Sequence, residues 1–304
     1  MSGYEIDEFY DKHEASAKLQ DLIDECNKGE KTKDMQLSTS KIKTASVKRI
    51  SRPESWRMYQ VVNDEPTEIV FRIQGIIQSK ELPPVGRNIN RSNRAKKHLR
   101  QQVTIFGFGA PLFQNFADSV EAMYIKYGDF ISDGHLEEWS PPTDGDSVGF
   151  DVINRYFTHA NYATGEPQVP FHETVDPFDV LKQMGGGNYV HTQDNHVDYI
   201  ERVIAENSKD YQIVSPTVFK VGDIVECALT ARCYPTGNSR VKMRLILKAL
   251  VLIDQQFREK ACILRMRNRI KAKPTFTSLK RPAIYDIEED INTSENAMSR
   301  MRLD

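Results

Sequence analysis

The sequence lacks two features that would assign it to a membrane or to an extracellular disulfide-rich class. No apolar run approaches the ~20 residues that a membrane-spanning helix needs. The four cysteines, at positions 26, 227, 233 and 262, form no tight cluster typical of a disulfide scaffold or a zinc module. The first residues, MSGYEIDEFYDKHE, are acidic and contain no apolar segment of a secretory signal. We therefore expect a nuclear or cytoplasmic protein that is neither secreted nor inserted in a membrane.

The sequence also lacks the short motifs of well-known enzyme classes. It contains no Gly-x-Ser-x-Gly, no His-Glu-x-x-His and no set of kinase motifs. His191 and His196 flank Asp194 in HTQDNH, but no further metal ligand is evident, so this segment is interpreted as a hairpin turn. We expect no cofactor and no catalysis. A metal-dependent nuclease built from scattered carboxylates stays open as an alternative.

The charges are abundant but separated along the chain. The 304 residues include 41 Lys and Arg against 43 Asp and Glu, for a formal net charge of −2. Residues 85–102 contain six basic and no acidic residues, and residues 239–281 contain thirteen basic and two acidic ones. Acidic residues gather in 128–151, in 166–206 and after 286. Because binding depends on local charge, the near-neutral total does not argue against a nucleic-acid partner.

The first 51 residues are predicted to hold one helix and a linker. Leu19, Leu22, Ile23 and Cys26 recur at the spacing of one helix face. Such a face either docks on the rest of the chain or binds a protein partner. Residues 30–50 are rich in Lys, Ser and Thr and contain no aromatic residue, a composition that favours a flexible linker.

Residues 52–258 carry the signals of a β-rich domain. Period-2 alternation predicts strands at 68–77 and 102–108, and apolar residues at helical spacing predict a helix over 112–127. Segments 189–192 and 196–203 are predicted to pair as a short hairpin. Two long strands around a Pro-Thr-Gly-Asn turn predict a further hairpin over 219–253, with Cys227 and Cys233 facing the core. A basic helix and an acidic tail are expected over 259–304.

Two basic elements of this domain form the candidate binding surface. The loop before the strand at 102–108 supplies the first group, and the outer face of the last strand supplies the second. Phe106 and Phe108 share one face of the strand that follows the loop, where aromatic rings stack on unpaired bases in single-strand binders. The predicted nucleic-acid-binding residues are Arg87, Arg91, Arg94, Lys96, Lys97, Arg100, Phe106, Phe108, Lys242, Arg244 and Lys248.

The closing hairpin carries two resemblances. Its sequence, SPTVFKVGDIVECALTARCYPTGNSRVKMRLILKALVLID, resembles a family of uncharacterised proteins of mushroom-forming fungi that we associate with mobile elements. Residues 55–57, 102–107 and 189–192 are also similar to that family, which implies no known activity. The hairpin is similar as well to the end of phage and viral single-stranded-DNA-binding OB-fold proteins. Apart from Tyr234 it lacks their aromatic residues, which moves the predicted stacking role to Phe106 and Phe108.

Together these observations predict a mainly β (α+β) protein with an OB-like barrel, or a related antiparallel β domain, with helical insertions and flexible tails. The predicted function is sequence-tolerant binding of single-stranded nucleic acid, DNA rather than RNA, without catalysis. The alternative is a scaffold protein that uses the basic face and the Leu19, Leu22 and Ile23 helix to bind a protein partner.

Overall fold

A computed structural model describes residues 6–51, 53–132, 135–163, 165–205, 208–237 and 239–271. The chain divides into two units, Met1–Met266 and Arg267–Asp304. The elements below belong to the first unit, except for the last residues of the final helix.

Five strands close into a barrel. They follow one another in the order β4-β5-β7-β13-β12, and β12 pairs with β4 to complete the ring. All neighbours are antiparallel except β7 and β13, which are parallel. Numbered along the chain, this order is 1-2-3-5-4, the strand order of an OB-fold. The prediction of a mainly β protein with an OB-like barrel is confirmed. The strands are β4 (Phe71–Glu81), β5 (Arg100–Phe106), β7 (Ser147–Arg155), β12 (Ile224–Gly237) and β13 (Arg240–Asp254).

Further strands extend the sheet beyond the barrel, next to β12 and next to β13. β2 pairs with β12 and leads to β1 and β3, while β10 lies parallel to β13 and leads to β11. The predicted hairpin of 189–192 with 196–203 is wrong, because β9 pairs with β8 and β10 pairs with β11. These strands are β1 (Ser46–Ser51), β2 (Glu54–Val62), β3 (Glu65–Glu68), β6 (Thr143–Asp144), β8 (Thr158–His159), β9 (Tyr189–Val190), β10 (Asp198–Ala205) and β11 (Ser208–Ile213).

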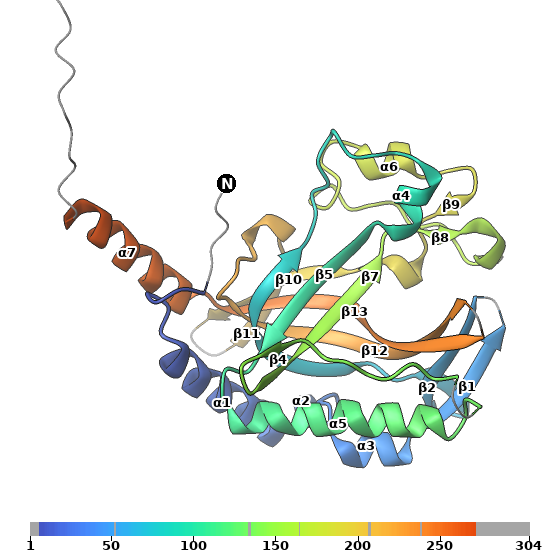
Figure 1. Ribbon diagram of the computed structural model, residues 1–304, viewed down its shortest axis with the longest axis horizontal. Helices are drawn as coiled ribbons and strands as arrows, with labels where there is room; N and C mark the ends of the chain where they lie inside the picture. Colours follow the sequence, from blue (N-terminus) through green and yellow to red (C-terminus); the bar gives the residue numbers. More distant parts are fainter. Residues whose placement is uncertain are drawn as a thin grey trace, which may run out of the picture. The chain divides into compact units, whose positions relative to one another are not determined.

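Helices lie on two sides of the barrel (Figure 1). Four of them, α1, α2, α3 and α5, lie along one side. Two others, α4 and α6, lie near the ends of β5 and β7 that are farther from α5. The predicted helix over 112–127 is confirmed as α5, with a proline in its first turn. The helices are α1 (Lys12–Lys28), α2 (Glu30–Lys33), α3 (Thr39–Thr44), α4 (Asn93–His98), α5 (Pro111–Gly128), α6 (Val180–Met184) and α7 (Gln256–Lys271), with short 3₁₀ turns η1 (Ala160–Tyr162), η2 (Gln193–Asn195) and η3 (Pro216–Val218).

The apolar face of α1 is covered by the chain itself. Leu19, Leu22 and Ile23 are buried, and α1 packs on β4 and α5. Of the two roles left open for this face, the structure shows docking on the rest of the chain, so these three residues are not accessible to a partner.

The segment predicted as a flexible linker is ordered. Residues 30–51 form α2, α3 and β1, and Leu37 and Ile42 are fully buried. The side chain of Gln36 also donates a 2.6 Å hydrogen bond to Gln74 on β4. The linker prediction is wrong because a few apolar side chains dock individually, which average composition does not register.

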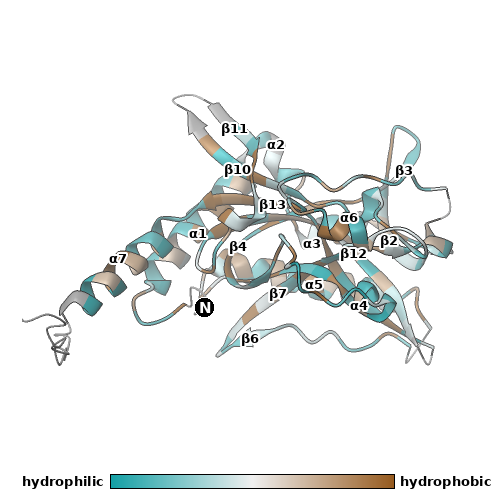
Figure 2. Ribbon diagram, turned by 90° about the horizontal axis from the view of Figure 1, so that it is seen from above, coloured by the Kyte–Doolittle hydropathy of each residue, from teal (hydrophilic) through white to brown (hydrophobic). Residues whose placement is uncertain are grey.

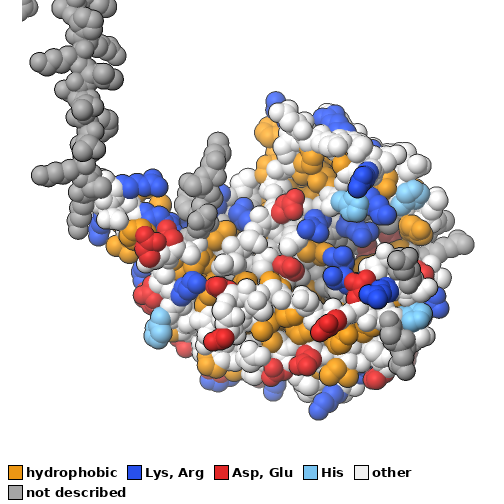
Figure 3. Space-filling model, in the orientation of Figure 1, with side chains coloured by type: hydrophobic (Ala, Val, Ile, Leu, Met, Phe, Trp, Pro, Cys, Tyr) orange, Lys and Arg blue, Asp and Glu red, His pale blue; other side chains and the backbone are white. Residues whose placement is uncertain are grey.

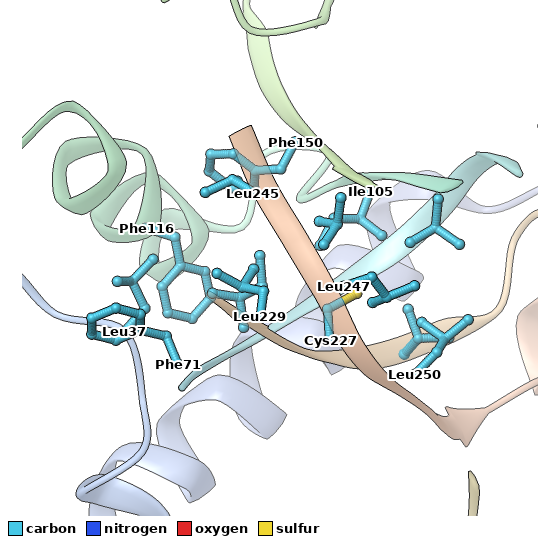
Figure 4. Close-up of a cluster of buried hydrophobic side chains, with 14 of the residues drawn as sticks. Leu37, Phe71, Ile105, Phe116, Phe150, Cys227, Leu229, Leu245, Leu247 and Leu250 are labelled. Carbon is cyan, nitrogen blue, oxygen red and sulfur yellow. The ribbon is translucent and has the colours of Figure 1, made fainter. Parts of the chain in front are cut away.

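The barrel interior is apolar. Ile105, Phe150, Leu245 and Leu247 come from β5, β7 and β13 and gather in one buried cluster (Figure 4). Inward residues alternate with outward ones, so the same alternation that fills the core places Arg100 and Arg244 outside. Cys227 and Cys233 are buried as predicted. Burial raises the pKa of both thiols, which keeps them protonated and unreactive.

Candidate nucleic-acid interface

The basic loop between the first two barrel strands divides into two parts with different contacts. In the first part, the Arg87 guanidinium lies 4.3 Å from the centroid of the Phe178 ring. Arg91 donates a 3.2 Å hydrogen bond to the side chain of Gln183. These two arginines are thus engaged with the segment around α6.

The second part of the loop is the short helix α4, which begins at the Ser92 cap and presents basic side chains. The Ser92 hydroxyl accepts a 3.2 Å hydrogen bond from the Ala95 amide. Arg94 and Lys97 are exposed and Lys96 is partly exposed. Within the described part of the chain none of the three forms an ion pair. The helix is hydrophilic in Figure 2.

Three arginines of neighbouring strands lie on the outer face of the barrel, two of them where α4 leads into it. Arg100 begins β5 and lies directly opposite Arg155, at the end of β7, in the antiparallel register. β13 runs parallel to β7, with Leu245 opposite Val152. Both of these side chains are buried in the core, so the neighbouring Arg244 lies on the outer side. Burial lowers the pKa of Arg244 and the charges of Arg155 and Arg100 lower it further, while the charge of Glu137 acts in the opposite direction. Among the described residues no carboxylate forms an ion pair with any of these guanidinium groups.

Lys and Arg side chains gather on this part of the surface. Figure 3 shows them over the ends of β5 and β7 near α4, with carboxylates at the margin. We call the set of Arg94, Lys96, Lys97, Arg100, Arg155, Lys242 and Arg244 the arginine face.

A pocket of about 180 Å³ opens within the arginine face. Its basic wall is formed by Arg100, Lys242 and Arg244, and its floor by apolar residues of β7 and β13. Segment 137–142 forms the other wall and includes Trp139. The segment is held at both ends, because the Glu137 amide donates to the Val241 carbonyl at 2.7 Å and the Pro142 carbonyl accepts from Gly149 at 2.8 Å.

Carboxylates at the pocket are bound mainly to neutral groups. Asp151 accepts hydrogen bonds from Thr104 at 2.7 Å and from Gln102 at 3.2 Å. Glu137 accepts from Thr236 at 2.5 Å and lies 3.9 Å from the Lys242 ammonium group. Lys242 is therefore paired with a carboxylate, whereas none of the three arginines forms an ion pair among the described residues.

No protein-family model matches the chain, and no curated protein is similar enough in sequence to count as a match. The interface is accordingly interpreted from its geometry alone.

Lys248, predicted to line the binding groove, belongs instead to a partly buried charge cluster. Its ammonium group donates to the backbone oxygen of Asp194 at 3.0 Å and lies 3.4 Å from the Asp194 carboxylate. Arg57 and Arg232 bind the same carboxylate at 3.0 and 2.9 Å, and Arg232 also binds Glu68. The prediction for Lys248 is wrong because its charge is already satisfied inside the protein.

The prediction that Phe106 stacks on bases is also wrong. Only 2% of its surface is exposed, and its ring packs so closely on Gly149 that a Cβ there would lie 2.6 Å from it. Phe108 is half-buried, with its ring 5.7 Å from that of Phe106 and 4.8 Å from the Lys12 ammonium group. The strand predicted to run to residue 108 ends at Phe106, and Phe108 follows it with a positive φ of 44°, so the period-2 pattern does not extend to Phe108.

The sequence did not point to two residues of the interface, Arg155 and Trp139. Arg155 becomes recognisable only once β7 is paired with β5, which places it opposite Arg100. Trp139 lies in an acidic segment of no regular pattern, and nothing in the sequence linked it to the basic residues.

The histidines of HTQDNH have structural contacts. His191 is buried, with its Nδ1 2.8 Å from the Tyr156 carbonyl oxygen, and His196 Nε2 lies 3.0 Å from Asp198. No three His, Cys, Asp or Glu side chains are grouped to hold a metal ion in the ranges that the structure describes. No described helix is long and apolar enough to cross a membrane.

Proposed function

We propose that this protein binds single-stranded nucleic acid, with little sequence preference, through the arginine face. One observation supports the proposal above the others: Arg100, Arg155 and Arg244 lie on one outer face of the barrel, and none of them forms an ion pair among the described residues.

Other arginines of the described chain are held in ion pairs within the protein. Arg57 and Arg232 share Asp194 and Glu68, and Arg258 binds Asp223. Like charges held close together repel, so an anion between Arg100, Arg155 and Arg244 is stabilising. A chain of phosphates supplies such anions at regular spacing and releases counterions when it binds.

The position of the arginine face within the barrel also supports the proposal. OB-fold proteins bind oligonucleotides on the face of their second and third strands and on the loops that join strands 1 and 2 and strands 4 and 5. Here the second and third strands are β5 and β7, which carry Arg100 and Arg155. The first loop contains α4, and Lys242 lies beside the β12–β13 turn.

Charge reversal at two exposed arginines tests the proposal. Arg100→Glu combined with Arg155→Glu should weaken binding of a fluorescent oligo-dT at least tenfold at low salt, measured by anisotropy. The slope of log K against log salt should fall by about 1.4, since each phosphate contact on a single strand contributes ~0.7. The matched control is Lys18→Glu with Lys48→Glu, two exposed cations of α1 and β1, which should bind like the unchanged protein. Circular dichroism verifies folding.

Two results would contradict the proposal. The first is absence of oligo-dT binding by the unchanged protein at micromolar concentration and low salt. The second is an equal loss of affinity in the arginine double variant and the lysine double variant, which would show that the loss comes from the change in net charge alone.

A further inference from the structure

Trp139 is placed where a bound strand would meet it. The indole lines the same pocket as Arg100 and Arg244 and is only partly buried. Within the described ranges it makes no hydrogen bond and no ring contact with another side chain. The indole packs in part against the hydrophobic core and also lines the pocket, beside two cations that form no ion pair among the described residues.

The pocket has two chemically different sides. Arg100 and Arg244 give it a cationic rim, while Phe150 and Leu245 on its floor are buried and apolar. A nucleotide has the same division, because its base is flat and uncharged and its phosphate is an anion. Glu137 and Glu138 also line the pocket next to Trp139, and their charges disfavour a phosphate on that side.

We propose that the pocket receives one unpaired base, stacked on Trp139, while the phosphate beside that base contacts Arg100 and Arg244. This inference rests on the proposed function, because it names what the arginine face holds at one position. Stacking of a base on an aromatic side chain strengthens single-strand binding and tolerates every base.

The size of the pocket limits what enters it. Its volume of about 180 Å³ corresponds to about six water molecules at ~30 Å³ each. Small-molecule sites usually measure about 300–1,000 Å³, so a whole nucleotide is not enclosed and the sugar stays outside. A paired base would have to leave its duplex first, at an energetic cost. The pocket therefore selects single strands over duplexes.

A comparison of normal and abasic oligonucleotides separates base binding from phosphate binding. Trp139→Ala should weaken binding of oligo-dT about tenfold, the order expected for one lost stacking contact. The same substitution should leave the affinity for an abasic oligonucleotide of equal length unchanged. Trp139→Phe, which keeps an aromatic ring, should retain most of the affinity for oligo-dT.

Fluorescence provides a second readout. The chain has two tryptophans, so Trp56→Phe leaves Trp139 as the single emitter. Its emission should be quenched by oligo-dT and not by the abasic strand, and duplex DNA should quench it far less than oligo-dT.

The outcomes distinguish the two proposals. If Trp139→Ala binds oligo-dT as tightly as the unchanged protein does, the base pocket is wrong and the arginine face stands. If the unchanged protein binds neither oligonucleotide, the proposed function itself fails. The affinity measurement on Trp139→Ala does not depend on the Trp56→Phe variant, so poor folding of that variant leaves the test intact.

Discussion

One carboxylate, that of Asp194, binds three cations within the protein. Asp194 lies in η2 and binds Arg57, Arg232 and Lys248, which come from β2, β12 and β13. Burial by itself would raise the pKa of Asp194. The hydrogen bonds from Arg232 and the charges of Arg232, Lys248 and Arg57 outweigh burial and hold this pKa well below its usual range. The cations of this cluster are therefore occupied, whereas Arg100, Arg155 and Arg244 form no ion pair within the described part of the chain.

Asp194→Asn should destabilise the protein strongly at neutral pH. Removing one member of a fully buried ion pair costs about 3–5 kcal/mol, and because the Asp194 side chain is 26% exposed we expect a smaller loss of about 2–3 kcal/mol. The carboxylate has a lower pKa folded than unfolded, so its contribution is complete above pH ~4 and is lost as the pH falls further. Urea denaturation at pH 7 and at pH 3 measures the difference between the two proteins.

The control for this prediction is Asp21→Asn, an exposed carboxylate of α1, which should cost little at either pH. Equal stability of Asp194→Asn and the unchanged protein at pH 7 would show that the cluster is not stabilising.

The sequence was informative about which face of a strand a residue occupies, and less so about its neighbours. Alternation placed Lys242 and Arg244 on an outer face and charge clustering singled out Arg100 in the basic loop, and the structure brings all three to one pocket. The same pattern included Lys248 and Phe106, whose surroundings are set by Asp194 and Gly149 from distant parts of the chain. Contacts between residues far apart in sequence leave no local periodic signal.

At the level of elements, prediction succeeded where the pattern is local. The α5 helix and the β12–β13 hairpin follow from helical spacing and from a Pro/Gly turn between alternating runs. The α3 helix and β1 were missed because their order comes from docking on α5 and β2 and not from their own composition. The parallel pairing of β7 with β13, which completes the barrel order, likewise has no local signature.

The acidic segment 137–142 should weaken nucleic-acid binding by its charge. Glu138 is exposed and lines the pocket beside Arg100 and Arg244. Glu138→Gln removes one repulsive charge near the phosphates, and affinity for oligo-dT at low salt should rise about two- to fivefold. Anisotropy titrations at low and high salt check this, because the gain should shrink as salt screens the charge.

The matched control is Glu121→Gln, an exposed carboxylate on α5, which should change the affinity little. Unchanged or weaker binding by Glu138→Gln would contradict a repulsive role for the segment.

At the scale of the molecule, the barrel explains how a chain with a formal net charge of −2 presents a basic surface. Two basic segments far apart in sequence meet on one face because β5, β7 and β13 are neighbours. Helices α1, α3 and α5 lie on another side of the barrel and leave this face uncovered (Figure 1). We therefore expect a bound strand to follow β5 and β7 from α4 toward segment 137–142.

Photo-cross-linking locates the strand most directly. An oligo-dT containing 4-thiothymidine, irradiated with the protein and analysed by mass spectrometry of the peptides, should attach to peptides that contain residues 94–102, 137–155 or 240–245. The cross-links should disappear in the Arg100→Glu, Arg155→Glu protein. Cross-links confined to α1, α3 or α5, or no cross-link at all, would contradict the assignment of the arginine face as a nucleic-acid interface.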